Sequence, residues 1–268
     1  VSGAFLDELD YDACFARGIE VLSCAPGFRQ AVAEMGLAMI LSGARGLVAE
    51  HEAFRRGDEA WLDDRDASDF TVYGEKIGFV GYGNIARELY RLLQPLAPNV
   101  SFYDPWVSNA ANAQKFDVIK DLFAANRVVV VSASPTSENR HAIGSAEIDS
   151  MPIGGLLVLL GRAHVIDFEA ALAAATAGRI TFATDVYPKE PVADDHAMRG
   201  ISKAIYSPHR AAAVPGGRQL IGKMILDDLK AIRAGTGARR LQVANAETLT
   251  ALVAAQKSIA EDGQLPGT

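Results

Sequence analysis

The sequence has little cysteine: Cys14 and Cys24 are the two in 268 residues. They lie ten positions apart with no second pair, a spacing that fits neither a zinc site nor a disulfide framework. We therefore expect reduced, half-buried thiols in a cytoplasmic protein.

Long apolar runs and blocks of like charge are also missing. No apolar stretch approaches the roughly 18 residues that a transmembrane helix needs, and no basic-then-apolar signal opens the chain. Lysine plus arginine number 26 against 33 aspartate plus glutamate, for a net charge of −7. We expect a soluble protein whose partners are neither nucleic acid nor membrane.

What the sequence does have is apolar content, 49% hydrophobic residues, enough for a sizeable core in one large or two small domains. It opens at Val1 on "VSGAFLDELDYDACFARGIEVLSC", which reads like the middle of an α/β unit. We therefore expect a further segment before Val1.

Six short apolar or β-branched runs alternate with helical patterns between residues 76 and 207. Several lack polar alternation, as expected of parallel strands covered on both faces. The pattern predicts an α/β fold with a doubly wound, six-stranded parallel (Rossmann) sheet. The runs are KIGFVG (76–81), VSFYD (100–104), RVVVVS (127–132), GLLVLLG (155–161), ITFATDV (180–186) and AIYS (204–207).

Helical patterns lie within and around this block. One follows the first run, with apolar residues at positions 85, 89 and 92, and an Ala-rich one covers 167–178. Longer patterns at 28–51 and 216–235 are predicted to cross between domains. The tail from 236 to 268 is polar and ends in DGQLPGT, which is predicted to fray.

A glycine-rich turn joins the first run to its helix. Gly81 permits a tight turn, Gly83 lets the backbone approach a pyrophosphate, and Ala86 takes the small third position of a dinucleotide fingerprint. The next run ends in Asp104, whose carboxylate can accept hydrogen bonds from a ribose diol and would repel a 2′-phosphate, so NAD is favoured over NADP. The alternative is a structural turn beside an exposed Asp-Pro corner.

Charged residues follow the later runs. Ligands of open α/β sheets bind outside the carboxyl ends of the strands, and this edge receives Arg162, Asp185 with Glu190, and His209. An arginine fork can bind a carboxylate, a histidine can protonate a carbonyl oxygen, and a neighbouring carboxylate supports the histidine. This set predicts a carbonyl reduction.

Each of these residues also has a purely structural interpretation. Arg162 can start a helix at the surface, Glu190 can be a loop acid before proline, and His209 can be an ordinary loop histidine. Their shared position at one sheet edge favours the catalytic interpretation. The other histidines show no metal-ligand spacing, so we expect no metal site; they are His51, His141, His164 and His196.

Together these stretches resemble the D-isomer-specific 2-hydroxyacid dehydrogenase family, which includes phosphoglycerate, glyoxylate/hydroxypyruvate and D-lactate dehydrogenases. The matching segments are FVGYGNIARELYRLL, YDP, VVVVSASPTSENRHAIG, LLVLLGRAHVIDFEAAL, DVYPKEP and SPHRAAA, collinear over about residues 1 to 235. Two departures are Ala86 at the third glycine position and Ala163 where the family usually has glycine.

The resemblance implies residue roles. Arg162 would orient a 2-oxoacid, Glu190 would pair with the histidine, and His209 would be the general acid/base. Substrate carboxylate binding is expected from Ser2, Gly3 and Ala4. The remaining cofactor contacts implied are Asn84 and Ile85 at the pyrophosphate, Ser134 across the sheet, and Leu160, Gly161, Asp185, Ala211 and Ala212 near the nicotinamide.

The resemblance also implies an organisation. Residues 1–30 would be the remnant of a substrate domain, 31–213 the NAD-binding domain, and 214–268 a helix and tail returning to the substrate domain. A homodimer through the helix near 28–51 is expected.

The predicted function is NAD-dependent interconversion of a 2-oxoacid and its D-2-hydroxyacid. Two alternatives stay open: a non-catalytic, NADH-sensing protein of the corepressor kind, and an inactive fragment of such an enzyme.

Overall fold

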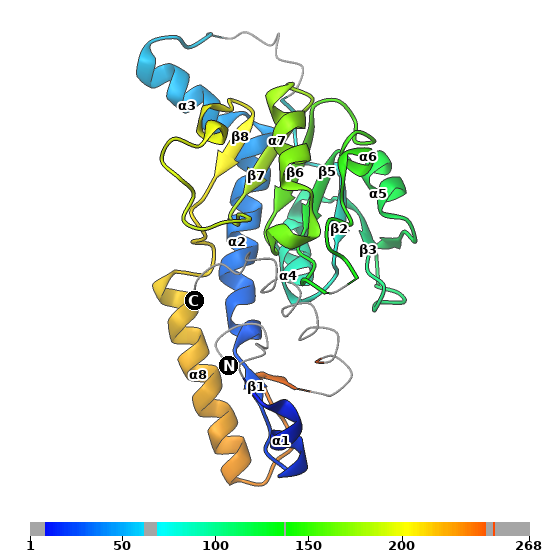
Figure 1. Cartoon of the computed structure of the whole chain (residues 1–268), viewed down its shortest axis with the longest axis vertical. Helices are drawn as coiled ribbons and strands as arrows, with labels where there is room; N and C mark the ends of the chain where they lie inside the picture. Colours follow the sequence, from blue (N-terminus) through cyan, green and yellow to red (C-terminus); the bar gives the residue numbers. More distant parts are fainter. Residues whose placement is uncertain (1–8, 62–68, 137, 245–248, 250–268) are drawn as a thin grey trace.

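The computed structural model describes residues 9–61, 69–136, 138–244 and 249. It has the predicted α/β architecture, with one large parallel sheet in strand order β4-β3-β2-β5-β6-β7-β8 (Figure 1). The strands are β2 (Lys76–Val80), β3 (Asn99–Tyr103), β4 (Gln114–Lys115), β5 (Val128–Val131), β6 (Gly155–Leu159), β7 (Ile180–Thr184) and β8 (Ala204–Tyr206).

All six predicted strands are confirmed, but the prediction of six strands was wrong by one. The seventh is β4, two residues long, which pairs in parallel with β3 at the edge. Both of its residues, Gln114 and Lys115, are polar, so no apolar run in the sequence predicts this strand. Every pairing in this sheet is parallel, so the carboxyl ends of its strands lie on one edge.

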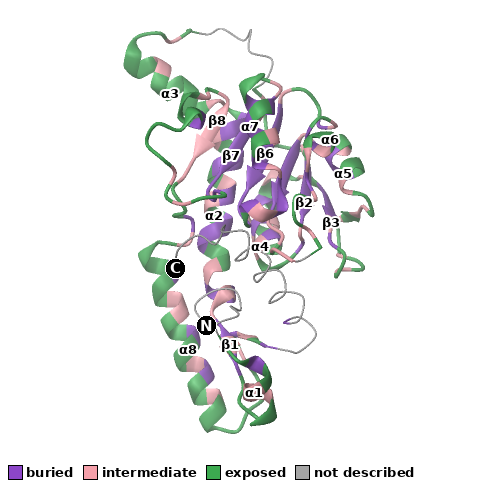
Figure 2. Cartoon of the chain, in the orientation of Figure 1, coloured by how far each residue is buried: buried purple, intermediate pink, exposed green. Residues whose placement is uncertain are grey.

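Helices cover both faces of the sheet, which makes its central strands buried on both sides (Figure 2). One face packs Phe79, Val130 and Val158 under α2 (Ala25–Ala44) and α4 (Asn84–Leu93). The other face carries the alternate side chains, including Leu157 and Phe182. It is covered by α5 (Ile119–Ala125), α6 (Ser145–Ile148) and α7 (Phe168–Thr176).

The helical pattern at 28–51 forms two helices, so the prediction of one long helix was wrong. α2 ends at Ala44 and α3 (Leu47–Arg56) begins after Gly46, whose positive φ of 58° turns the chain through 62°. Among the described residues no single helix is long and apolar enough to cross a membrane. The two together reach that length only across the bend, and α2 packs on the sheet.

Below the sheet lies a small second lobe (Figure 1). We use "lower lobe" for α1 (Tyr11–Ala16), β1 (Leu22–Ser23) and β9 (Gln242–Val243), with the adjoining α8 (Pro215–Arg233). β9 pairs antiparallel with β1, so this part of the polar tail is joined to the N-terminal segment. Residues 245–248 and 250–268, including the DGQLPGT end that was predicted to fray, lie outside the described residues.

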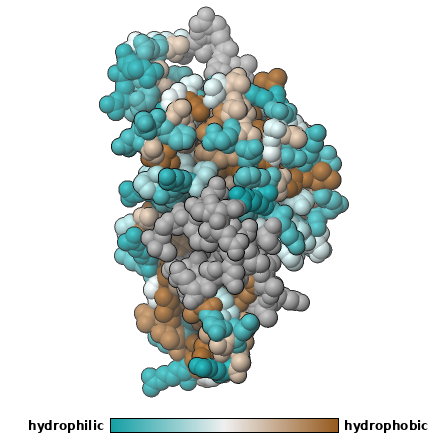
Figure 3. Space-filling view, in the orientation of Figure 1, coloured by the Kyte–Doolittle hydropathy of each residue, from teal (hydrophilic) through white to brown (hydrophobic). Residues whose placement is uncertain are grey.

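Two long helices connect this lobe to the sheet. α2 runs from the lobe up over β6 and β7, and α8 packs along α2. Gly27 of α2 lies against Ile221 of α8, where a Cβ would overlap the isoleucine side chain. The apolar stripe of α8 is largely solvent-exposed: Leu229 is 56% and Ile232 45% exposed, and apolar surface appears over this helix in Figure 3.

The described residues also form three short 3₁₀ helices. They are η1 (Gln94–Leu96), η2 (Ala163–Val165) and η3 (Ala197–Gly200). The second is the one that matters for the site, because it begins directly after Arg162 and ends the loop that carries this residue.

Candidate active site

The glycine-rich turn between β2 and α4 contains two glycines with different requirements. Gly81 has φ 84°, and a Cβ there would lie 2.5 Å from Ala133 Cα, so the fold itself demands glycine. Gly83 has an ordinary negative φ of −85°, and a Cβ there would meet nothing within 4 Å. The open space over the Gly83 Cα is what close approach of a pyrophosphate needs, so the turn fits a dinucleotide.

The N-terminus of α4 faces the same space. Asn84 is exposed, Ile85 is partly buried, and no side chain caps the helix, so its first N–H groups are free for an anion. Ala86 is fully buried in the core between α4 and the sheet. Its small side chain thus performs the packing role of the third glycine.

Asp104 lies directly after β3 and is 8% exposed. Its Oδ2 accepts a hydrogen bond from the Tyr82 N–H at 2.7 Å, and its Oδ1 accepts one from the Trp106 N–H at 2.8 Å. The carboxylate therefore orders the glycine-rich turn, and each oxygen keeps a lone pair for a further donor. The structure places its charge beside the turn.

The loop after β5 crosses the same edge. Ser134 is exposed, and its carbonyl accepts a hydrogen bond from Asn139 Nδ2 at 2.8 Å. Ser132 Oγ donates to the Gly81 carbonyl at 3.0 Å, which ties this loop to the glycine-rich turn.

The loop after β6 brings Arg162 to this edge. The Leu160 and Gly161 N–H groups both donate to the Val131 carbonyl, at 2.9 and 3.1 Å, and a Cβ on Gly161 would lie 2.7 Å from the Ala133 carbonyl oxygen. Arg162 Nη1 donates to the Gly161 carbonyl at 3.0 Å.

The Arg162 side chain reaches solvent, yet the surrounding protein removes part of its hydration. Desolvation lowers the pKa of Arg162, while the negative charges of Glu190 and Asp185 act in the opposite direction. Arginine stays charged under these conditions, so an incompletely hydrated cation faces the edge of the sheet.

Asp185 follows β7 and is 2% exposed. Its Oδ1 accepts from the Arg210 N–H at 2.8 Å and its Oδ2 from the Ala211 N–H at 3.0 Å. These two bonds fix the loop immediately after His209. The family resemblance implies a position of Asp185 near the nicotinamide. The structure adds that Asp185 holds the histidine loop, a role that no sequence motif predicts.

Glu190 joins two loops through its two carboxylate oxygens. Oε1 accepts from the Tyr187 N–H at 3.0 Å, and Oε2 lies 2.7 Å from His209 Nδ1. The Tyr187 hydroxyl donates to the Ser207 carbonyl at 2.9 Å, and burial raises the pKa of Tyr187 to about 12. The tyrosine therefore remains a neutral donor that supports the chain just before His209.

His209 has a positive φ of 51°, rare for a residue with a side chain. Its Nδ1 is occupied by Glu190, which leaves Nε2 for a substrate. His209 also lines an open cleft of about 560 Å³ between its own loop, α2 and α8. The other residues lining the cleft are Cys24, Phe28, Ala212, Ala213, Arg218, Ile221 and Ile225.

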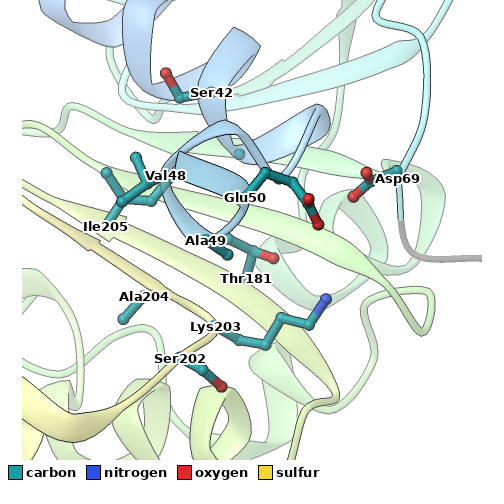
Figure 4. A pocket seen from close by; sticks show the side chains of 12 residues that line it. Ser42, Val48, Ala49, Glu50, Asp69, Thr181, Ser202, Lys203, Ala204 and Ile205 are labelled. Atoms are coloured by element: carbon teal, nitrogen blue, oxygen red, sulfur yellow. The ribbon is translucent and has the colours of Figure 1, made fainter. Parts of the chain in front are cut away.

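A second hollow lies at the opposite, amino-terminal edge of the sheet (Figure 4). Thr181 and Lys203, at the starts of β7 and β8, and Glu50 of α3 line it. Its volume is about 50 Å³, room for water and too small for a substrate. The candidate active site is therefore the carboxyl edge.

The structure brings most of the predicted residues to that edge. Glu190 and His209 form a direct pair with Asp185 beneath the loop, and Arg162 lies on the loop after β6, within electrostatic reach of both carboxylates. Ala211 is buried under the loop, and Ala212 lines the cleft. The predicted carboxylate site at residues 2–4 lies outside the described residues.

Sequence reasoning missed the wall of the cleft opposite the sheet. Phe28 and Ile221 come from helices whose apolar residues were interpreted only as packing positions. Arg218 was not singled out, although an arginine in the opening turn of a helix that lacks acidic residues there is a usable signal.

A family model described as D-isomer specific 2-hydroxyacid dehydrogenase, NAD binding domain, matches residues 37–211. The chain is similar to a D-3-phosphoglycerate dehydrogenase of Archaeoglobus fulgidus, 28% identical over 89% of this chain and 45% of the relative. It is also similar to a glyoxylate/hydroxypyruvate reductase of Arabidopsis thaliana, 26% identical over 84% of this chain and 70% of the relative.

A solved structure shares the fold closely. A phosphoglycerate oxidoreductase from Rhizobium etli is 32% identical, with a TM-score of 0.81 over 89% of this chain and 78% of that one. The chain spans about half the length of the phosphoglycerate dehydrogenases it matches.

Proposed function

Because the chain belongs to the D-isomer-specific 2-hydroxyacid dehydrogenase family, we propose that it interconverts a 2-oxoacid and its D-2-hydroxyacid with NAD(H), using His209 as the general acid/base. The observation that carries the proposal is the 2.7 Å contact between His209 Nδ1 and Glu190 Oε2 at the carboxyl edge of the sheet.

This contact prepares His209 for proton transfer in either direction. With Glu190 accepting from Nδ1–H, the ring is oriented and its positive charge is stabilised, so Nε2–H can donate to the carbonyl oxygen at C2. In the oxidation direction Nε2 takes the proton of the hydroxyl group. Asp185 and Tyr187 hold the backbone on either side of His209, which keeps Nε2 in place.

Arg162 is proposed to bind the other end of the reacting group. Its guanidinium can hold the C1 carboxylate with two parallel hydrogen bonds and stabilise negative charge that develops on the C2 oxygen. The partial desolvation that lowers the pKa of Arg162 also strengthens its attraction for an anion, because less water screens the charge.

NAD(H) supplies a hydride to C2 when it is bound. The residues proposed to hold it are Gly81, Gly83 and the amino end of α4, with Asp104 at the ribose. Asp104 supports NAD over NADP, because its buried carboxylate would repel a 2′-phosphate. Steric openness above Gly83 supports a pyrophosphate there.

The test is a steady-state assay with glyoxylate, hydroxypyruvate and pyruvate, each with NADH and with NADPH. The wild-type chain is expected to reduce at least one of the three and to prefer NADH. His209→Ala should lower kcat by about 100- to 10,000-fold, the range for losing an acid/base group, while the affinity for NADH, measured by fluorescence titration, stays the same.

The matched control is His51→Ala, which removes an exposed histidine on α3, away from the carboxyl edge. It should match the wild type. Equal turnover by His209→Ala and the wild type would refute the role of His209. Tight NADH binding by a wild-type chain that turns over no 2-oxoacid would favour the NADH-sensing alternative. The cytoplasmic location, the homodimer and the domain boundaries stay predictions.

A further inference from the structure

The cleft beside His209 has a second cationic side chain that the proposed reaction does not use. Arg218 lines this cleft from the first turns of α8, and no acidic residue lies in the first turn of that helix. Within the described part of the chain, the Arg218 guanidinium forms no hydrogen bond or ion pair. The cleft therefore holds a positive charge that no side chain in its described lining neutralises.

The topology separates the two arginines. Arg162 follows β6, His209 follows β8 at the edge of the sheet, and β7 lies between these strands. The chain then runs from His209 into α8, which presents Arg218 to the cleft, whereas Arg162 does not line it. If the substrate carbonyl is at His209 and the C1 carboxylate is at Arg162, the space open to the remaining carbons beside His209 is the cleft that His209 shares with Arg218.

Most of the other side chains that line the cleft are apolar. Phe28, Ile221 and Ile225 line it together with His209 and Arg218, and Gly27 packs closely on Ile221, which joins the two helices here. Such a wall suits a short carbon chain. Besides His209 and Arg218, the polar side chain in the described lining is Cys24. Of these, the guanidinium is the group that prefers carboxylate or phosphate oxygens.

We propose that Arg218 determines substrate specificity by binding a second anionic group, a carboxylate or a phosphate, at the end of the 2-oxoacid away from its C1 carboxylate. The proposal rests on the proposed 2-oxoacid chemistry for the position of the reacting carbon. The binding of a dianion in the cleft is a separate property that can be measured without turnover.

The kinetic test uses matched pairs of substrates. 2-Oxoglutarate is compared with 2-oxopentanoate, which has the same carbon chain without the second carboxylate, and 3-phosphohydroxypyruvate is compared with hydroxypyruvate. The wild type should show a kcat/KM at least tenfold higher for the dianion of one pair; the pair that shows it distinguishes carboxylate from phosphate. Arg218→Gln should lower kcat/KM for that dianion by about 10- to 100-fold, the loss expected for a charge-assisted hydrogen bond, and change the monoanion less than twofold.

The control variant is Lys223→Gln, which removes the same charge from the exposed surface of α8 without touching the cleft. It should retain the preference for the dianion, which excludes an effect of net charge. Arg218→Lys should recover part of the loss, since it restores the charge but not the planar fork.

A binding measurement separates this inference from the proposed function. Titration calorimetry compares glutarate with pentanoate and 3-phosphoglycerate with glycerate, on the wild type and on Arg218→Gln. Tighter binding of a dianion that is lost in Arg218→Gln supports the inference even if no 2-oxoacid is reduced, an outcome that refutes only the proposed function. Reduction of 2-oxoacids with no preference for a dianion, or with a preference that Arg218→Gln retains, overturns the inference and leaves the proposed function standing.

Discussion

The sheet and the lower lobe are stabilised in different ways. In the sheet, two continuous apolar layers sandwich strands whose side chains are buried on both faces, with Phe79, Phe102 and Phe182 fully buried. In the described part of the lower lobe the apolar cluster has four buried residues, and the two strands are two residues long. Because this cluster is much smaller than the layers of the sheet, we expect polar contacts to carry more of the stability of the described lobe.

Buried aspartates show the difference at the scale of single residues. Asp228 of α8 is 2% exposed and accepts the Arg240 and Leu241 N–H groups at 2.7 and 2.9 Å, which fixes the entry to β9. Asp185 binds two backbone N–H groups in the same way in the histidine loop. Asp228 holds a lobe whose described apolar cluster is small, whereas Asp185 positions a side chain at the edge of a sheet with two large apolar layers.

The largest difference between the two regions should appear when a buried leucine is shortened in each. Leu157→Ala removes a fully buried side chain from β6 and should lower the free energy of unfolding by about 2–5 kcal/mol. Leu241→Ala, next to β9, should cost only about 1–2 kcal/mol, because a cavity at the edge of a small lobe can collapse or fill with water. Urea unfolding followed by circular dichroism measures both.

Hydrogen exchange distinguishes a global from a local loss of stability in these two variants. Leu157→Ala should speed exchange throughout the sheet, and Leu241→Ala should speed it in β1 and β9 alone. Equal losses of unfolding free energy in the two variants would contradict the view that the lobe depends little on its apolar core.

The difference between the sheet and the lower lobe also determines which elements the sequence could predict. All six longer strands were predicted because a strand buried on both faces, such as Val128–Val131, is a continuous apolar run. The strand Gln242–Val243 was missed because it has two residues and its partner Leu22–Ser23 lies over 200 positions earlier. No local pattern in the sequence predicts such a pairing.

The candidate site also has one part that the sequence predicts and one part that it does not. His209, Glu190 and Arg162 were found because they follow strands, and the ends of parallel strands meet at one edge. The opposite wall of the cleft was not predicted, because Phe28 and Arg218 come to line one cleft only when α2 packs on α8. Helix packing between distant segments leaves no periodic signal in the sequence.

A smaller effect is expected when the two aspartates are compared directly. Asp185→Asn and Asp228→Asn each keep one acceptor oxygen and lose the other, so each should cost about 1–3 kcal/mol of local stability. Asp185→Asn should also lower kcat, because the loop after His209 is released, while Asp228→Asn should leave kcat unchanged and speed exchange near β9. Assays and hydrogen exchange on the same preparations measure both properties.

The outcome that would contradict this assignment is a loss of kcat in Asp228→Asn as large as that in Asp185→Asn. It would mean that the lower lobe controls the geometry of His209 through α8, and the two aspartates would then serve one connected site.

The smallest predicted effect is a pH dependence confined to the sheet. All five histidines lie between positions 51 and 209, outside the lower lobe. Desolvation lowers the pKa of His164, whose Nε2 lies 3.1 Å from the Thr136 carbonyl and joins the loop of Arg162 to the loop after β5. In the unfolded chain this histidine binds a proton near its ordinary pKa of about 6.5, so the unfolded state holds more protons as the pH falls below that value. The stability of the sheet should therefore rise with pH through this window and be lost on acidification.

His164→Gln should reduce the slope of unfolding free energy against pH. Hydrogen exchange in β1 and β9 should change equally in the wild type and in His164→Gln between pH 7 and 5. An unchanged slope in His164→Gln would show that His164 is hydrated in the folded chain and contributes nothing to the contrast between the two regions.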